Sequence, residues 1–312
     1  MHETITVGVD GSPESMDAVD WAAREALLRG MPLTLLHAGY ESAAATHLPE
    51  IDVPAQRQNQ ALDIAVREVT SRHPGLEVVP LLIHGPPSDS LLMAARSAQM
   101  LVLGSRGFSG FAGFMLGSVA LDVTARATCP IVLVRAGEHA QDEHLRTVLG
   151  TPSSRTPYRP VVLGLDIANA GDELLAFAFD AAIARDAPLQ VIHAWKVPPL
   201  YSYGQAYDPR PTPDIDVRAA TQEALTAALR PWTEKYPGTH TRVHLLEGGA
   251  AHHLRAAADG ASLLVVGRRD TAGYRLGPVT HSAIHHVECP VAAVPHGAQL
   301  GGATPAVEQE PQ

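Results

Sequence analysis

The chain has 312 residues, a length typical of two domains of about 150 residues that each bury their own core. Hydrophobic residues make up 46% of it and charged residues 18%, as in a globular protein, and no apolar run approaches the roughly 20 residues that span a bilayer. The formal net charge of -10 disfavours non-specific binding to nucleic acid or to anionic lipid.

Apolar runs of strand length alternate with longer amphipathic segments in both halves of the chain. The first half predicts strands near Ile5–Val9, Leu33–His37, Glu77–Ile83, Leu101–Gly104 and Ile131–Val134. It predicts helices at Ser15–Arg29, Ala55–Arg72, Ser88–Ala98 and Ser118–Ala127. The second half predicts strands near Val161–Leu165, Leu189–His193, Val243–Leu246, Leu263–Val266 and Val291–Val294. This alternation is typical of a parallel sheet with helices on both faces, so the expected fold class is α/β.

The second half of the chain repeats the first. Asp10 aligns with Asp166, and further along Cys129 aligns with Cys289, each cysteine being followed by proline. We therefore expect a duplicated domain. The repeat and the composition between and after its copies predict a first domain over residues 1–137, a linker over 138–158, a second domain over 159–296 and a disordered tail over 297–312.

The start of the chain and its cysteines indicate the compartment. Met1 to Thr4 carries neither the basic region nor the apolar stretch of a signal peptide, so we expect a cytoplasmic protein. Cys129 and Cys289 stand at the mouths of apolar runs and do not have the spacing of a disulfide framework. We expect both to be buried small side chains.

Two segments at strand ends are candidates for ligand binding, because ligands of open parallel sheets bind at the carboxyl ends of the strands. Asp10 follows the first strand and could accept hydrogen bonds from a ribose hydroxyl or a base. Its simpler role is to cap the next helix, for which Asp and Ser are favoured. The second segment follows the fourth strand and has a more specific pattern.

This second segment is rich in glycine. It reads Gly104-Ser105-Arg106-Gly107, then nine residues, then Gly117-Ser118-Val119 at the start of a predicted helix. Glycines let backbone N–H groups approach phosphate oxygens closely, and a helix start offers free amides and the positive end of the dipole. The segment indicates an anion site, most simply for a polyphosphate; the alternative is an ordinary glycine-rich surface loop.

On this motif and the first-strand aspartate, the chain resembles the universal stress protein family in its tandem, two-domain form. ATP-binding members carry Gly, two residues, Gly, nine residues and then Gly-Ser or Gly-Thr, which is the pattern of residues 104–118. The resemblance implies two Rossmann-like domains of the adenine nucleotide α-hydrolase-like type, each with a five-stranded parallel sheet. It also implies that Ile131–Val134 and Val291–Val294 pair with each other across a pseudo-twofold axis.

The resemblance further implies a cofactor, ATP accompanied by Mg²⁺, and a role for each motif residue. Asp10 and the backbone at Ala38 would face adenine and ribose. The phosphates would be held by Gly104, Gly107, Gly117, Ser118 and Val119.

The second half departs from the motif. Asp270 stands where the second glycine belongs, and the loop from Gly267 to Gly277 is three residues shorter than its counterpart. Pro278 replaces the serine and removes both a hydroxyl and a backbone N–H. The charge of Asp270 would repel phosphates, although Arg268 and Arg269 could partly offset it. We therefore expect weak, altered or absent ATP binding in the second domain.

Several histidines could belong to a metal site or could simply lie on a partly exposed helix face. His281 and His285 lie one helical turn apart, with His286 adjacent, so they could share a ligand face. No cysteine or glutamate partner stands at a recognisable spacing, and a partly exposed helix face explains them more simply, so we expect no metal site. His37 and His193 recur at equivalent strand ends, where hydrogen-bonded structural histidines are expected.

Signatures of catalysis are missing from the sequence. It has no Walker A motif, no Gly-x-Ser-x-Gly elbow and no distinctive pair of carboxylates, so we assign no catalytic residue and expect no efficient ATP hydrolysis; slow turnover is left open. The favoured hypothesis is an ATP-binding stress-response regulator that signals to unidentified protein partners through its nucleotide-dependent conformation, with homodimerisation as a further expectation. The alternatives are a slow ATPase or nucleotidyl-transfer enzyme and a ligand-independent interaction module.

Overall fold

The computed structural model describes residues 4–39, 53–105, 116–196, 213–269 and 276–297. In the first half the elements are β1 (Thr4–Gly8), α1 (Pro13–Arg29), β2 (Leu33–Gly39), α2 (Val53–Arg72), β3 (Val78–His84), α3 (Pro87–Ala95), β4 (Ala98–Ser105), α4 (Ser118–Arg126) and β5 (Ile131–Arg135). In the second half they are β6 (Val161–Gly164), η2 (Ile167–Asn169), α5 (Asp172–Ala184), β7 (Leu189–Trp195), α7 (Pro213–Lys235), β8 (Thr241–Glu247), α8 (Ala250–Ala258), β9 (Leu263–Arg269), α9 (Pro278–His286) and β10 (Val291–His296).

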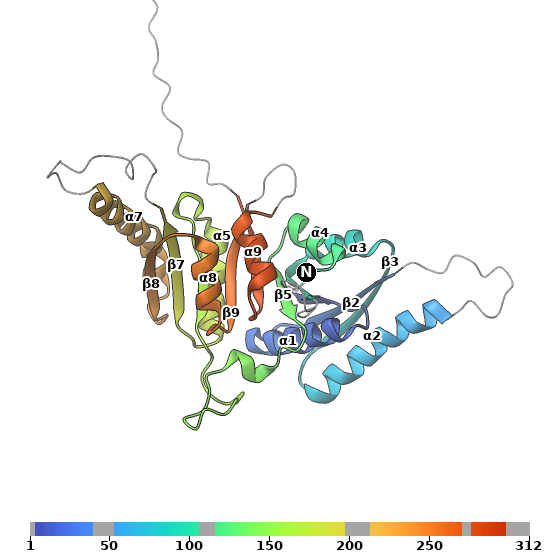
Figure 1. The fold of residues 1–312 in the computed structure, drawn as a ribbon. Coiled ribbons are helices and arrows are strands. Elements are labelled where there is room, and N and C mark those ends of the chain that lie inside the picture. The colour runs from blue at the N-terminus through green and yellow to red at the C-terminus, as the bar shows by residue number, and fades with distance from the viewer. Residues whose placement is uncertain (1–3, 40–52, 106–115, 197–212, 270–275, 298–312) are drawn as a thin grey trace, which may run out of the picture.

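The strands of both halves form one sheet in the order β3-β2-β1-β4-β5-β10-β9-β6-β7-β8 (Figure 1). Within each half every pairing is parallel. The halves meet at β5 and β10, which pair antiparallel with Val132 opposite Ala292. The α/β class, the two tandem domains and the pairing of the last strands are therefore confirmed.

The helices cover both faces of the sheet, and each layer continues from one domain into the other. On one face α1 and α2 pack beside α5 and α7, through side chains such as Trp21 and Phe179. On the other face α3 and α4 pack beside α8 and α9, through side chains such as Val123 and Ile284. Because the central strands are buried on both faces, they read as continuous apolar runs, and β5 is buried throughout.

Two buried arginines cross the junction between the domains. Arg135, at the end of β5, donates to two carbonyl oxygens at the C-terminal end of α9, one of them that of Val287 at 3.0 Å. Arg268, in β9, donates to two carbonyl oxygens at the C-terminal end of α4, one of them that of Ala125 at 3.1 Å. Each guanidinium satisfies free carbonyls and lies at the negative end of a helix dipole, so each ties one domain to a helix of the other.

A buried carboxylate, Glu25 of α1, also joins the domains. It accepts hydrogen bonds from Arg29 Nε at 2.6 Å and from Arg185 Nη2, at the end of α5, at 2.7 Å. The Arg185 guanidinium lies over the rings of Trp21 and Tyr158, 5.9 and 5.8 Å from their centroids. Burial alone would raise the pKa of Glu25, but the two arginines outweigh it, so the pKa is lowered and the carboxylate is charged.

The segment between β5 and β6 packs against α1. It contains a short 3-10 helix, η1 (Ala140–Glu143), and the side chains of Glu143 and His144 are buried. Glu143 accepts a hydrogen bond from Arg24 Nη2 of α1 at 2.7 Å. The connection between the domains is thus part of the packed structure.

Glu138→Gln is expected to reduce the pH dependence of folding stability. Burial and the nearby Glu143 and Asp142 carboxylates raise the pKa of Glu138 to about 8. A carboxyl pKa raised in the folded state gives stability that is present below the unfolded pKa of about 4.3 and lost as the pH rises through about 8. Urea unfolding of both proteins between about pH 5 and pH 8.5 measures this, and the variant should gain about 2 kcal/mol or more on the wild type over that range. Parallel pH curves would contradict the prediction.

Candidate functional site

A pocket of about 530 Å³ opens at the carboxyl ends of β1, β2 and β4, against the first turns of α1, α3 and α4. This is the point at which the strand order of the first domain reverses, between β1 and β4. Leu36, Leu91 and Leu103 supply apolar walls. The volume lies within the roughly 300–1,000 Å³ usual for small-molecule sites.

The residues selected from the sequence converge on this pocket. Six of them line it, and these six are Asp10, Ala38, Gly104, Gly117, Ser118 and Val119. The seventh, Gly107, lies outside the described residues.

Asp10 orders the turn between β1 and α1 but does not cap the helix. Its Oδ1 accepts hydrogen bonds from the backbone N–H of Ser12 at 2.9 Å and from the Ser12 hydroxyl at 2.5 Å. The N-cap is Ser12, whose hydroxyl oxygen accepts from the N–H of Ser15 at 3.2 Å. The capping role considered for Asp10 is therefore wrong. Partial burial would raise the pKa of Asp10, but the hydrogen bonds from Ser12 outweigh it and lower the pKa, so the carboxylate is a charged acceptor.

Gly104 has a packing role that the motif does not reveal. A Cβ at this position would lie 2.4 Å from the carbonyl oxygen of Glu14 and 2.9 Å from the backbone nitrogen of Ser15. The absence of a side chain lets β4 run against the first turn of α1. This contact holds two walls of the pocket together.

Gly117 differs from Gly104, because no contact with a described residue requires it to be glycine. It is the N-cap of α4 with φ of -64°, and a Cβ built on it would meet nothing within 4 Å. It has no side chain to cap the helix. The first three residues of α4, Ser118, Val119 and Ala120, have N–H groups without a partner inside the helix, and they line the pocket. The position leaves room, free donors and the positive end of a dipole for an anion.

The described lining of this pocket is acidic rather than basic. Asp10 and Glu14 lie on it, and none of its described residues is Lys or Arg. Among the described lining residues, the groups that favour an anion are the first amides and the dipole of α4. The residues that the sequence analysis missed, among them Ser12, Pro87 and Leu91, belong to the turns and helices beside the motif. The Asp-Gly-Ser turn at Asp10 was the one local signal for Ser12.

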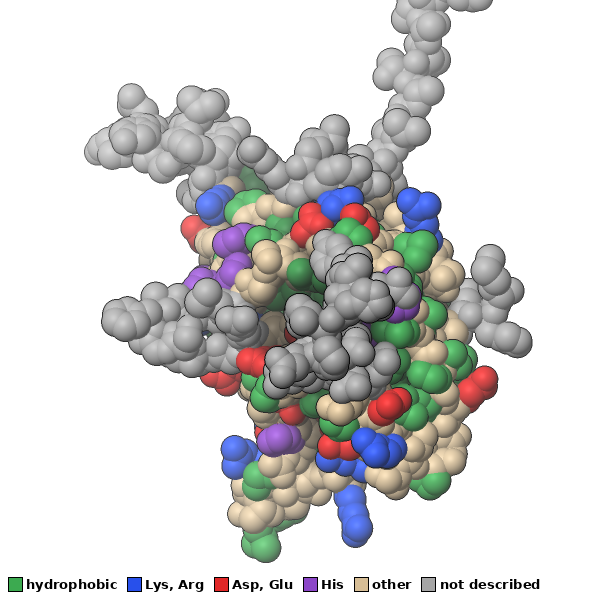
Figure 2. All heavy atoms as spheres, turned by 90° about the vertical axis from the view of Figure 1, so that its right-hand side faces the viewer, with side chains coloured by type: hydrophobic (Ala, Val, Ile, Leu, Met, Phe, Trp, Pro, Cys, Tyr) green, Lys and Arg blue, Asp and Glu red, His purple; other side chains and the backbone are tan. Residues whose placement is uncertain are grey.

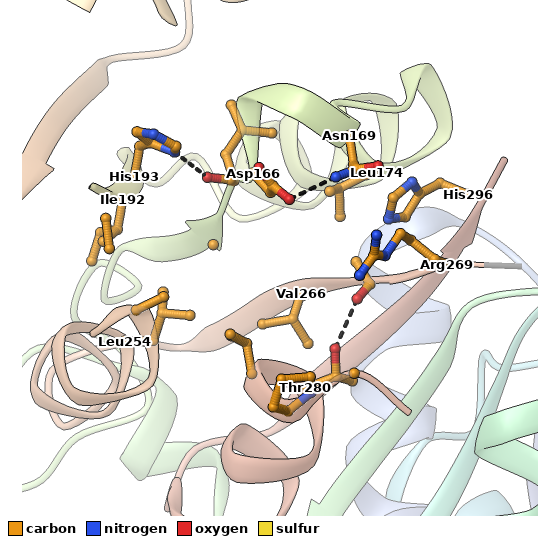
Figure 3. Close-up of a pocket in the computed structure, with 18 residues that line it drawn as sticks. Asp166, Asn169, Leu174, Ile192, His193, Leu254, Val266, Arg269, Thr280 and His296 are labelled. Atoms are coloured by element: carbon orange, nitrogen blue, oxygen red, sulfur yellow. Dashed lines mark hydrogen bonds between the residues drawn. The ribbon is translucent and has the colours of Figure 1, made fainter. Parts of the chain in front are cut away.

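The second domain has a corresponding pocket of about 420 Å³, at the carboxyl ends of β6, β7 and β9 (Figure 3). Asp166, the counterpart of Asp10, accepts hydrogen bonds from the N–H of Ala168 at 3.2 Å and from Asn169 Nδ2 at 2.7 Å. Of the two arginines expected near the phosphates, Arg269 lines the pocket, but Arg268 is buried at the domain junction and does not. Asp270 lies outside the described residues.

His37, His193 and the two cysteines have structural roles. His37 Nδ1 pairs with the carbonyl oxygen of Val9 at 2.6 Å, and His193 Nδ1 with that of Leu165 at 2.8 Å, so both hold strand ends as expected. Both cysteines are free and buried, also as expected. In the described part of the chain, no three His, Cys, Asp or Glu side chains gather as metal ligands.

Comparison with known proteins decides the family. The model of the universal stress protein family matches residues 1–135 and again residues 157–295. The chain belongs to the universal stress protein family.

Relatives from this family match nearly the whole chain. Universal stress protein Rv2005c of Mycobacterium tuberculosis is 30% identical over 303 residues, which cover 92% of this chain and 95% of the relative. A universal stress protein structure from Archaeoglobus fulgidus superposes with a TM-score of 0.63 at 18% identity, covering 94% of this chain and 98% of that chain. A structure described as a universal stress protein from Pseudomonas aeruginosa gives a TM-score of 0.59 at 17% identity, covering 95% and 94%. These structures support the fold and the two-domain form.

Figure 2 shows one face of the molecule, with the first domain turned toward the viewer. On that face of the first domain, the described acidic and basic side chains are interspersed and form no continuous basic area. Among the described helices, none has the length and apolar character needed to cross a bilayer.

Proposed function

We propose that this protein binds ATP in the pocket of its first domain and acts as a stress-response regulator whose conformation depends on the nucleotide. In this proposal Asp10 and the backbone at Ala38 face the ribose and adenine, while Gly104 and the first turn of α4 surround the phosphates. The protein works in the cytoplasm through partner proteins, as a binding module and not as an efficient ATPase.

The observation that carries this proposal is the position of Gly117. This glycine heads a helix beside the pocket, its missing Cβ points into open space, and the first amides of the helix lie next to it. Among the described residues no contact requires glycine there, whereas a bound phosphate would. Gly277 has the same surroundings, but α9 begins with Pro278, which lacks the N–H that Ser118 supplies in α4. The apolar walls and the charged acceptor at Asp10 fit a base and a ribose at the other end.

The acidic lining supports a requirement for Mg²⁺. Asp10 and Glu14 would repel a bare triphosphate, and no described lining residue is a cation that could offset them. Mg²⁺ binds phosphate oxygens and few protein ligands, so it can enter with the nucleotide. The same lack of a described cation clamp supports binding without efficient phosphoryl transfer.

Gly117→Asp is expected to weaken ATP binding about 100-fold or more, a loss of about 2.7 kcal/mol. The carboxylate would occupy the space left for phosphate, accept hydrogen bonds from the same amides and repel the ligand. Aspartate is a favoured N-cap, so α4 should be no less stable and a loss of binding would not report unfolding. Calorimetric titration of the nucleotide-stripped protein with ATP and Mg²⁺ measures the effect.

Gly277→Asp is the matched control, because Gly277 is the N-cap of α9 in the second domain and its missing Cβ also meets nothing within 4 Å. It should leave the first-domain ATP site unchanged. Equal losses in the two variants, or no ATP binding by the wild type, would sink the proposal and favour a ligand-independent interaction module. Metal-dependent turnover at a steady rate would favour an enzyme.

A further inference from the structure

The sheet ends in two edge strands, β3 in the first domain and β8 in the second (Figure 1). An edge strand presents backbone N–H and C=O groups that can pair with a strand of another chain. The side chains leave both edges accessible, since Val243 and His244 of β8 are exposed, as are Val79 and Leu81 of β3. The backbone groups on the outer side of each strand therefore decide whether it can pair.

The outward backbone groups of β8 belong to its odd-numbered residues. The N–H of Leu189 in β7 donates to the carbonyl oxygen of His240 at 3.0 Å. In a parallel pair, successive residues direct their backbone groups to opposite sides of the strand, so the even-numbered residues of β8 face β7. The odd-numbered residues direct an N–H and a C=O away from the sheet, where no described strand pairs with them. Three of these outward residues are Thr241, Val243 and Leu245.

The edge of β3 is blocked by a proline. The N–H of Leu33 in β2 donates to the carbonyl oxygen of Glu77 at 2.9 Å, so in β3 the even-numbered residues point outward. Pro80 is one of them, and it has no N–H to give to an added strand. Pro80 is the third residue of β3, and the third residue of β8 is Val243. The two domains thus differ at this position, and β8 has the edge that can pair.

The sequence of β8 is complementary to itself in an antiparallel pair. With His244 at the centre, Val243 lies opposite Leu245 of a second copy, in residue pairs that exchange two backbone hydrogen bonds each. These are apolar pairs, which stabilise a sheet. Arg242 lies opposite Leu246, so no two charged side chains oppose each other.

The neighbouring registers are less favourable. A register centred on Leu245 would place Val243 opposite the Glu247 carboxylate. The carbonyl oxygen of Glu247 also accepts a hydrogen bond from an imidazole of α8 at 2.8 Å, so this end of β8 is partly occupied. A register centred on Val243 would place two basic side chains, Arg242 and His244, opposite each other. The edge therefore favours pairing about His244.

We propose that two copies of this chain associate through β8, by antiparallel pairing of Val243 with Leu245 across a twofold axis at His244. The ten-stranded sheets of the two copies then form one continuous sheet. Because Pro80 blocks the opposite edge of each copy, association ends at two copies and does not continue as a fibre. The contact involves no residue that lines either strand-end pocket, so this proposal does not depend on ATP binding.

Val243→Pro introduces into β8 the block that β3 carries naturally. The N–H that it removes points away from β7, and Pro80 shows that an edge strand of this fold accepts proline there, so the monomer should fold. We expect the wild-type full-length chain to pass from monomer to dimer between about 1 μM and about 1 mM in sedimentation equilibrium, and Val243→Pro to stay monomeric.

Val243→Ile is the matched control, because it keeps both the N–H and an apolar side chain, and it should dimerise like the wild type. Circular dichroism checks that each variant is folded. A wild type that is monomeric at about 1 mM, or a Val243→Pro dimer as tight as that of the wild type, would overturn the proposal.

Disulfide cross-linking locates the contact without changing the backbone. In the proposed register His244 faces His244 of the second copy in a pair without mutual hydrogen bonds, whose Cα atoms lie about 4.5 Å apart and can be bridged. His244→Cys should therefore give a covalent dimer on mild oxidation. Leu81→Cys, at the equivalent fourth position of β3 and also exposed, should not. The native cysteines are buried and should not contribute. Equal cross-linking of the two variants, or none in His244→Cys, would contradict pairing through β8.

Discussion

Arg185→Ala is expected to destabilise the protein by about 3–5 kcal/mol, because it would leave the buried Glu25 carboxylate short of a partner. The two side chains are 0% and 3% exposed and meet at 2.7 Å. The variant also removes the guanidinium from the rings of Trp21 and Tyr158. Because Arg185 and Glu25 belong to different domains, the loss should also make the two domains unfold less cooperatively. Urea unfolding followed by tryptophan fluorescence and by circular dichroism measures both effects.

Two further variants separate charge from packing. Arg185→Met combined with Glu25→Leu should recover part of the stability, since it leaves no unpaired buried carboxylate. The recovery should be incomplete because Arg29, whose side chain is 10% exposed, loses its hydrogen bond to Glu25. Arg126→Ala, which disrupts an ion pair with Asp122 at 2.9 Å between side chains that are 38% and 39% exposed, should cost less than about 1 kcal/mol. If Arg185→Ala costs no more than Arg126→Ala, the buried pair does not hold the domains together.

Gly104→Ala is expected to cost about 2–3 kcal/mol and to weaken ATP binding at the same time. The new Cβ would lie 2.4 Å from the Glu14 carbonyl oxygen and 2.6 Å from its carbon, which are backbone atoms and cannot rotate away. The start of α1 must then move off β4, and with it the turn that carries Asp10. Urea unfolding and calorimetry with ATP and Mg²⁺ measure the two losses.

Gly75→Ala is the matched control for that substitution. Gly75 is an exposed turn residue of the same domain, and a Cβ there would meet nothing within 4 Å, so the change should stay within about 0.5 kcal/mol. Wild-type stability in Gly104→Ala would show that β4 and α1 can separate without cost, contrary to the close packing described above.

The sequence was sufficient for the architecture because buried parallel strands leave long apolar runs. The boundary between α3 and β4 is instructive. A helix was expected up to Ala98, but α3 ends at Ala95 and Ala98 already pairs with Thr4 of β1. The polar Gln99 interrupts the apolar run, and pairing with the neighbouring strand decides the structure there.

The parts of the site that lie in one local motif could be predicted from the sequence. The parts that depend on contacts between residues far apart in the sequence could not. The glycine motif places Gly104 and Gly117 correctly at one pocket, yet their different roles depend on the distance between β4 and α1. His296 follows the last strand and reaches the pocket of the second domain only because Gly171 and Gly267 come together in the fold. No local pattern in the sequence contains that information.

The positions of Arg268 and Arg269 follow from the geometry of a β-strand. Arg268 and Arg269 were both expected near the phosphates, but successive side chains of a strand point to opposite faces. Arg269 faces the pocket, and Arg268 faces the other way into the junction with α4. Strand alternation therefore places Arg269 at the pocket and Arg268 at the domain junction.

A crystal structure of the full-length protein grown with excess ATP and Mg²⁺ tests the central claim most directly. We expect ordered nucleotide in the first pocket, with phosphate oxygens on the amides of Ser118 and Val119 and the ribose beside Asp10. We expect no equally ordered triphosphate in the second pocket. Equal, well-ordered ATP in both domains, or an empty first pocket at saturating ATP, would contradict the claim that the first domain is the ATP site.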